Sequence, residues 1–389
     1  MNQRALLCLV LSLAACGGGD GGVLPVLDQD AGFDSGPVPE DAGPPDPSGF
    51  MVQTVDAELE IASLLDLAID ANDIEHIACR RQNSGAVLYV RPVSGLYVVE
   101  EVEGVSGAGL DVSLALDNAV SPHIAYWDGD THTLRYAHKS GSAWSLATID
   151  TLRSSDSAEI SLEVVPASGH AAVAYSDAMN HEVLFAENDG SLDWTLSVID
   201  DARSNTPSVG LQLSADADPF VMHGVRGLGI DAAFLAQRNV ETWQDIASIP
   251  DNGGASMSFA MNGAGDVFVA YAIASGSDDA LRLATLRHGE TSWSTLVVDD
   301  ETFVGTAISL AIAPSGEIGI AYYDWQQSDL YYAHGSPTSM DHVRIESARH
   351  QVFRSSLAFD SFSRPHIAYR DAFTNHLRIA VGRAPAPAQ

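Results

Sequence analysis

The stretch Pro122-His123-Ile124-Ala125-Tyr126 decides the fold, because it recurs as Pro365-His366-Ile367-Ala368-Tyr369 and, in looser form, five more times. The seven copies end at Cys79, Tyr126, Tyr175, His223, Tyr271, Tyr322 and Tyr369. Successive copies are 47, 49, 48, 48, 51 and 47 residues apart. A fixed period of about 20 to 50 residues is the signature of a repeat architecture.

Each copy contains short stretches with strand character. Thirteen residues before the end of a copy, or fourteen in the third copy, a small residue opens an apolar alternation. The members of this series are Ser113, Ser161, Gly210, Ser258, Ser309 and Ser356, with Asp66 as the exception in the first copy. A third stretch follows the recurring motif, and a fourth opens on a large apolar residue with an acid six positions later, as in Trp144 and Asp150. We interpret the serines as small packing residues where repeats converge.

The last copy lacks its fourth stretch, and a matching one stands at the other end of the chain. Phe50 precedes Asp56 by the same six positions, ahead of the first copy. Four-stranded units arranged radially, with the first strand completing the last unit, form a closed ring without open sheet edges. The sequence therefore predicts an all-β fold over residues 50–382: a seven-bladed β-propeller of four-stranded antiparallel blades, closed by the strand 50–56.

The first residues are typical of an export signal. Arg4 precedes an apolar run that is too short to span a bilayer, which needs about 20 residues. Leu13-Ala14-Ala15-Cys16 resembles the lipobox of bacterial lipoproteins. This resemblance implies a signal peptide at 1–15, lipidation of Cys16 and, since residue 17 is Gly rather than Asp, an outer-membrane or cell-surface location. An ordinary secretory signal is the alternative.

A tether is expected between the anchor and the propeller. Residues 17–49 hold nine Gly, six Pro and seven acidic residues, with no basic ones. Such a segment cannot bury enough apolar surface to order itself, so we expect 16–49 to be disordered, like the tail 383–389. Cys8 leaves with the signal and Cys16 is lipidated, so Cys79 becomes the only free thiol.

The charge of the chain limits its partners. It carries 52 acidic against 19 Lys and Arg residues, a formal net charge of −33. Nucleic acid binding needs clustered cations, so nucleic acid is excluded as a partner. We expect a monomer that meets the membrane through its lipid anchor alone.

The repeats resemble those of bacterial propeller lipoproteins and, more distantly, the Asp-box or BNR-type propellers that include sialidases. Gly141-Ser142-Ala143-Trp144 and the segment 289–293, Gly to Trp, carry the resemblance. Both lack the Ser-x-Asp that precedes Gly in an Asp-box, so no catalytic residue is carried over.

Candidate ligand-binding residues follow the recurring motif. An acid stands two positions past its final Tyr in four copies, at Asp128, Asp177, Asp324 and Asp371, with Trp127 and Trp325 beside the series. Around a ring these side chains share one face and could contact a ligand. Alternatively, each Asp caps its own turn through hydrogen bonds to the backbone.

Arginines form a second candidate series in the loops between blades. Arg153, Arg203 and Arg349 follow Asp150, Asp200 and Glu346 by three positions. Guanidinium groups suit the carboxylates or hydroxyls of a glycan. The alternative is that each arginine pairs with its local acid.

No cofactor or metal site is predicted. His-x-x-x-His and Cys-x-x-Cys spacings are absent, and Asp128-Gly129-Asp130 lacks the rest of a calcium loop. His76, His123 and His366 share one strand position and are expected to pack between blades. Near-equal repeats favour a non-enzymatic binding or scaffold propeller for a glycan or an envelope protein. The alternative is a carbohydrate-active enzyme, a sialidase-like hydrolase or a polysaccharide lyase.

Overall fold

The computed structural model describes most of the chain from residue 49 onward. The described ranges are 49–56, 58–104, 111–152, 159–177, 179–201, 208–227, 230–240, 242–249, 256–273, 280–301, 304–346 and 354–383. Contacts divide the chain into the units Met1–Gly36 and Pro37–Gln389, and every described residue lies in the second. The expected signal peptide and Cys16 lie outside the described residues, as do the expected tether and tail except for their end residues Gly49 and Arg383.

The described residues form seven sheets of four antiparallel strands, which we number as blades 1 to 7. Blade 1 contains β2 (Ile61–Ile69), β3 (Glu75–Arg81), β4 (Val87–Val93) and β5 (Leu96–Glu103). Blade 2 contains β6 (Val112–Leu116), β7 (Pro122–Asp128), β8 (Thr133–Ser140) and β9 (Ala143–Thr151). Blade 3 contains β10 (Ile160–Val164), β11 (Ala171–Asp177), β12 (Glu182–Glu187) and β13 (Thr195–Asp200). Blade 4 contains β14 (Val209–Leu213), β15 (Pro219–Gly227), β16 (Ile230–Asn239) and β17 (Thr242–Ser248).

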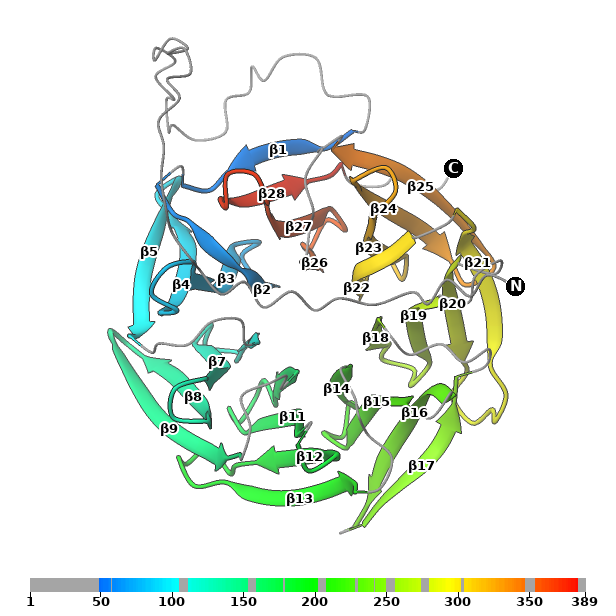
Figure 1. Cartoon of the computed structure of the whole chain (residues 1–389), viewed down its shortest axis with the longest axis horizontal. Coiled ribbons are helices and arrows are strands. Elements are labelled where there is room, and N and C mark those ends of the chain that lie inside the picture. Colours follow the sequence, from blue (N-terminus) through cyan, green and yellow to red (C-terminus); the bar gives the residue numbers. More distant parts are fainter. Residues whose placement is uncertain are drawn as a thin grey trace, which may run out of the picture. The chain divides into compact units, whose positions relative to one another are not determined.

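The remaining blades repeat this order. Blade 5 contains β18 (Met257–Met261), β19 (Val267–Ile273), β20 (Ala280–Leu286) and β21 (Ser294–Asp299). Blade 6 contains β22 (Val304–Ile312), β23 (Ile318–Asp324), β24 (Asp329–Ser336) and β25 (Ser339–Glu346). Blade 7 contains β26 (Ser355–Phe359), β27 (Pro365–Arg370), β28 (Leu377–Val381) and β1 (Met51–Thr54). Figure 1 shows the blades arranged radially, which confirms the predicted seven-bladed propeller. None of the described segments is a helix long and apolar enough to cross a membrane.

The first strand closes the ring as predicted. β1 pairs antiparallel with β28, with Met51 opposite Val381 and Thr54 opposite Arg378. Each blade's first strand lies innermost, and the seven innermost strands contact one another in a continuous circle.

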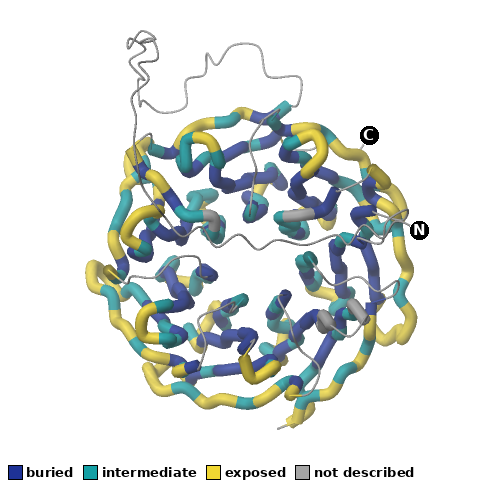
Figure 2. The backbone as a smooth tube through the Cα atoms, in the orientation of Figure 1, coloured by how far each residue is buried: buried dark blue, intermediate teal, exposed yellow. Residues whose placement is uncertain are grey.

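Burial follows strand position within a blade. The second strands β7, β11 and β23 are buried along their whole length, because neighbouring blades cover both of their faces. The outermost strand β17 instead alternates between exposed and half-buried residues. Figure 2 shows the same gradient, with exposed residues gathered on the outer rim. The hydrophobic core is therefore a series of layers between adjacent blades.

The outer parts of neighbouring blades are joined by aromatic pairs. Trp144 of blade 2 meets Tyr89 of blade 1 edge to face, with ring centroids 5.6 Å apart. Trp194 meets Tyr136 in the same way at 5.0 Å, and Phe50 meets Tyr332 at 5.4 Å. The large residues that open the fourth strands thus pack against the third strand of the preceding blade.

The final Tyr of the recurring motif also joins blades. Tyr175 donates its hydroxyl proton to Asp150 at 2.7 Å, and Tyr322 donates to Asp299 at 2.7 Å. Tyr126 and Glu103, and Tyr369 and Glu346, make the corresponding bonds. Each acceptor is an acid at or next to the end of the fourth strand of the preceding blade. The two repeated features of the sequence are therefore partners across the blade interface.

Candidate ligand-binding site

The innermost strands enclose a polar cavity of about 350 Å³ in the central channel. This volume falls within the range of roughly 300 to 1,000 Å³ that small-molecule sites occupy. Residues two positions apart on a strand point to the same face, so each innermost strand directs alternate side chains toward the channel. The polar lining residues are Asp66, Ser113, Glu159, Ser161, Glu163, Gln212, Ser258, Ser309, Arg354, Ser355 and Ser356.

One ring of these residues, which we call the serine belt, joins neighbouring blades. It consists of the predicted small residues Asp66, Ser113, Ser161, Gly210, Ser258, Ser309 and Ser356. Apart from Gly210, each belt residue accepts a hydrogen bond through its side chain from the next blade. The donor is the backbone N–H of the residue directly after that blade's own belt residue. The donors are Leu114, Leu162, Leu211, Leu310, Leu357 and Leu67, at 2.9 to 3.0 Å. The serines therefore pack as expected and, together with Asp66, they also bond neighbouring blades at six of the seven blade interfaces.

The belt lacks this hydrogen bond between blades 4 and 5, where the belt residue is Gly210. It has no side chain to offer blade 5, and a Cβ atom there would lie 2.6 Å from Cδ1 of Phe259. The Phe259 ring of blade 5 thus occupies the space that a serine would need. The glycine is required by this close approach.

Two acids mark one level of the cavity. Glu163 accepts a hydrogen bond from Nε2 of Gln212 at 2.7 Å. Burial and the nearby Asp66 raise the pKa of Glu163 to about 8. Burial also raises the pKa of Asp66, which accepts the Ser356 hydroxyl at 2.8 Å. Near neutral pH, Glu163 is therefore protonated in a large fraction of molecules and can donate a hydrogen bond as well as accept one.

A second group of charged residues at the cavity consists of Arg354 and two acids, Asp111 and Glu159. Arg354 lies 2.7 Å from Asp111. Burial raises the pKa of Glu159 to about 7, although Arg354 acts in the opposite direction. The cavity thus presents hydroxyls, carboxyls, one amide and one guanidinium that is already paired, and this set suits hydrogen bonding to an uncharged, hydroxyl-rich ligand.

The predicted face acids are engaged in their own turns. Asp128, Asp177, Asp324 and Asp371 each accept backbone N–H groups two and three residues later through Oδ1. Oδ2 of Asp128 also accepts the Thr131 hydroxyl at 2.6 Å, and Oδ2 of Asp177 accepts Asn180 Nδ2 at 2.7 Å. These bonds match the turn-capping alternative, and a contact with a ligand stays a prediction.

The predicted aromatic and arginine contacts have different outcomes. Trp127 is 0% exposed and packs in the core layer between blades 2 and 3, so its ring does not reach a ligand. Trp325 is 39% exposed and meets Tyr323 edge to face at 5.7 Å. Arg153, Arg203 and Arg349 lie outside the described residues.

Comparison with known proteins identifies the fold. No protein-family model matches the chain, and no curated protein matches it in sequence. A triple arginine-to-alanine mutant of AofleA from Arthrobotrys oligospora is similar, with a TM-score of 0.52 and 12% identity over 76% of this chain and 90% of that chain. The polysaccharide lyase Uly1 gives 0.51 and 9% over 84% and 90%.

A third similar structure is a PL25 polysaccharide lyase, an ulvan lyase bound to -[GlcA(1-4)Rha3S]-. Its TM-score is 0.50 with 14% identity, over 71% of this chain and 77% of that chain. At such identities the likeness shows the propeller fold alone. This propeller thus shares its architecture with polysaccharide lyases.

Proposed function

We propose that this chain is a non-enzymatic binding propeller that takes an uncharged, hydroxyl-rich glycan at its central channel. The observation that carries the proposal is the polar cavity of about 350 Å³ enclosed by the seven innermost strands. Lipidated Cys16 holds the propeller at the outer membrane or cell surface. Trp325 and the arginines Arg153, Arg203 and Arg349 belong to the proposed ligand contacts.

The hydrogen bonds of the cavity acids support binding over hydrolysis. Glu163 accepts Nε2 of Gln212 at 2.7 Å, and Glu159 accepts the backbone N–H of Val209 at 3.1 Å. Asp66 is held by its bonds to the serine belt, so it is not placed as a free nucleophile.

Charge supports a neutral ligand. The net charge of the chain is −33, and Arg354 in the cavity is already paired with Asp111. A polyanionic polysaccharide would be repelled over the surface and would find no unpaired cation among the described cavity residues. A neutral sugar avoids this repulsion, and its hydroxyls match Gln212 and Glu163.

A polysaccharide lyase is the second candidate. The structural likeness to two lyases and the raised pKa of Glu163 favour it, because perturbed carboxyl groups in cavities are common in active sites. A lyase would leave a new C=C bond in its product. Ultraviolet absorbance of that bond distinguishes turnover from binding.

The test is a glycan array that contains neutral and polyanionic polysaccharides, probed with the full chain. We expect saturable binding to neutral glycans that weakens in Glu163→Gln and in the triple variant Arg153→Ala, Arg203→Ala, Arg349→Ala. Glu290→Gln, in an exposed turn, is the matched control. Binding restricted to polyanions, or release of unsaturated products, would refute the proposal. Silence across the array would also refute it and would direct the search to an envelope protein.

A further inference from the structure

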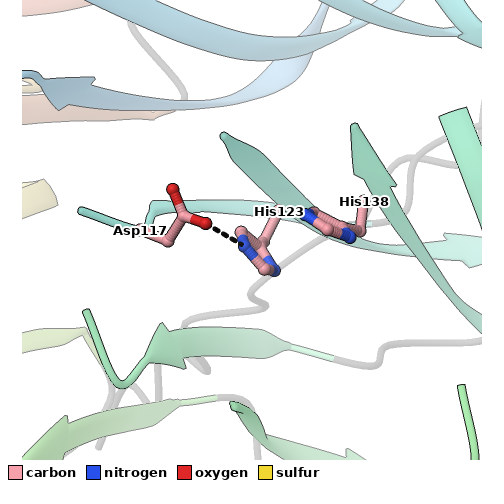
Figure 3. A group of neighbouring side chains, drawn as sticks. All are labelled: Asp117, His123 and His138. Carbon is pink, nitrogen blue, oxygen red and sulfur yellow. Dashed lines mark ion pairs between the residues drawn. The ribbon is translucent and has the colours of Figure 1, made fainter. Parts of the chain in front are cut away.

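Blade 2 brings three potential metal ligands together on separate elements. Asp117 directly follows β6, His123 lies in β7 and His138 lies opposite it in β8. Their ligand atoms all lie within 4.8 Å of one another, and His123 Nε2 is 3.8 Å from Asp117 Oδ2. Figure 3 shows the carboxylate directed toward the His123 ring, with the His138 ring beside it. The two imidazole rings stack with centroids 4.3 Å apart.

The hydrogen bonds around this group leave ligand atoms available. Asp117 Oδ1 caps its own turn by accepting the N–H groups of Ala119 and Ser121, while Oδ2 faces His123. His123 is 1% exposed, and its Nδ1 lies 2.5 Å from the Tyr136 hydroxyl. Its Nε2 is buried and has no hydrogen-bond partner among the described residues. A buried polar atom without a partner is costly, and a bound metal ion would satisfy this nitrogen. Nε2 of His76 in blade 1 is unpartnered in the same way, so the second imidazole has to distinguish blade 2.

Oδ2 of Asp117 meets the His123 ring without a Lys or Arg partner among the described residues. When Nδ1–H donates to the Tyr136 hydroxyl, Nε2 carries the lone pair, as in histidines that bind metals through Nε2.

Two other blades provide an internal comparison. Asp70 lies 3.5 Å from His76 in blade 1, and Asp360 lies 3.3 Å from His366 in blade 7, with the same separation of six residues. His76 also contacts a tyrosine hydroxyl through Nδ1 at 2.5 Å. In blade 7, the residue opposite His366 is Val381 rather than a histidine. In blade 1, Ile77 pairs with Val90, and the residue next to Val90 on the His76 side is Arg91 rather than a histidine. The Asp–His pair thus belongs to the fold, whereas the second imidazole distinguishes blade 2.

We infer that Asp117, His123 and His138 bind a divalent transition metal ion, with Zn²⁺ as the best fit. Two imidazoles and a carboxylate are ligands that Zn²⁺ accepts, at about 2.0 to 2.2 Å, and three protein ligands leave a coordination position open. Ligand atoms around tetrahedral Zn²⁺ are about 3.4 Å apart. Small side-chain rotations would bring the three ligand atoms from their present separations of up to 4.8 Å to this distance. Asp117 and His138 are partly exposed, which gives the ion a route from solvent.

This site is separate from the proposed glycan site. Asp117, His123 and His138 are not among the residues that line the central cavity. The sequence criterion of closely spaced histidines missed it, because cross-strand pairing brings His138 to His123 from fifteen residues away.

The test is calorimetric titration of the chelator-treated full chain with Zn²⁺, alone and with millimolar Mg²⁺. Visible absorbance of Co²⁺ in the same site reports imidazole ligation. We expect one ion per chain, unaffected by Mg²⁺. His138→Gln and Asp117→Asn should each weaken binding by about tenfold or more, since even indirect ligand partners contribute 10- to 100-fold.

The matched control is His76→Gln in blade 1, which should bind Zn²⁺ like the unaltered chain. The partly exposed His138 makes its variant compatible with folding, and circular dichroism checks this. The inference would be overturned if the unaltered chain bound no Zn²⁺, if Mg²⁺ displaced the ion, or if His138→Gln and Asp117→Asn bound as tightly as the control.

Discussion

Removal of two serine-belt hydroxyls tests whether these bonds hold the blades together. Ser161→Ala deprives the Leu211 N–H of its acceptor, and Ser309→Ala does the same to Leu357. An orphaned buried donor costs about 1 to 3 kcal/mol. Water in the adjacent cavity can partly replace the hydroxyl, so we expect about 1 to 1.5 kcal/mol for each serine.

The two sites lie in blades 3 and 6 and share no partner, so their effects should add to about 2 to 3 kcal/mol. An unfolding entropy of about 2.1 cal/mol/K per residue over roughly 330 residues converts this sum to a fall in Tm of about 3 to 4 °C. Scanning calorimetry and urea unfolding of the single and double variants measure it. Ser256→Ala is the control, because Ser256 lies two positions before the belt residue Ser258 and is not a belt member.

A double variant as stable as the Ser256→Ala control would refute this reasoning. It would mean that water or backbone rearrangement fully replaces the hydroxyls. A loss much larger than the sum of the single variants would instead show that the belt acts as one cooperative unit.

Three further predictions concern pH, the tyrosine bonds and Gly210. The folded chain holds a proton on Glu163 that the unfolded chain releases above its ordinary pKa of 4.5. The free energy of unfolding should therefore fall as pH rises from about 5 to 8, and urea titrations should show a weaker fall in Glu163→Gln. Tyr175→Phe leaves Oδ2 of Asp150 without its donor and should cost about 1.5 to 3 kcal/mol in urea unfolding; an unchanged midpoint would show that the bond contributes nothing. Gly210→Ala should clash with the Phe259 ring and lower Tm, with about 1 to 3 kcal/mol lost, and Gly210→Ala combined with Phe259→Leu should recover part of it.

The architecture could be predicted because each blade repeats the same local constraints. A short polar side chain such as Ser113 bonds to the next blade, and the largely apolar run of β7 suits its full burial. Phe50 and Asp56 have the same spacing as the residues of the fourth strands, so even the closing strand could be predicted from the sequence. The pairing of β1 with β28 confirms it.

Contacts between repeats could not be predicted in the same way. The series of final tyrosines and the series of fourth-strand acids were both visible, but nothing local shows that Tyr175 reaches Asp150 of the preceding blade. The acids on the channel wall were equally hidden. Glu163 stands out only when the innermost strands of several blades surround it and remove it from water.

The seam between β1 and β28 has a consequence for how the chain is made. Met51, among the first residues of the propeller to leave the ribosome, finds its partner Val381 only when the last blade has been synthesised. Until then β28, the strand with which β1 pairs, has not been synthesised. β1 is therefore an unpaired strand, the kind of edge that associates with other chains. A chain that ends shortly before Val381 would therefore lose the closure of the ring along with one strand. The ring therefore stays open at the position of β1 until the last blade has been synthesised.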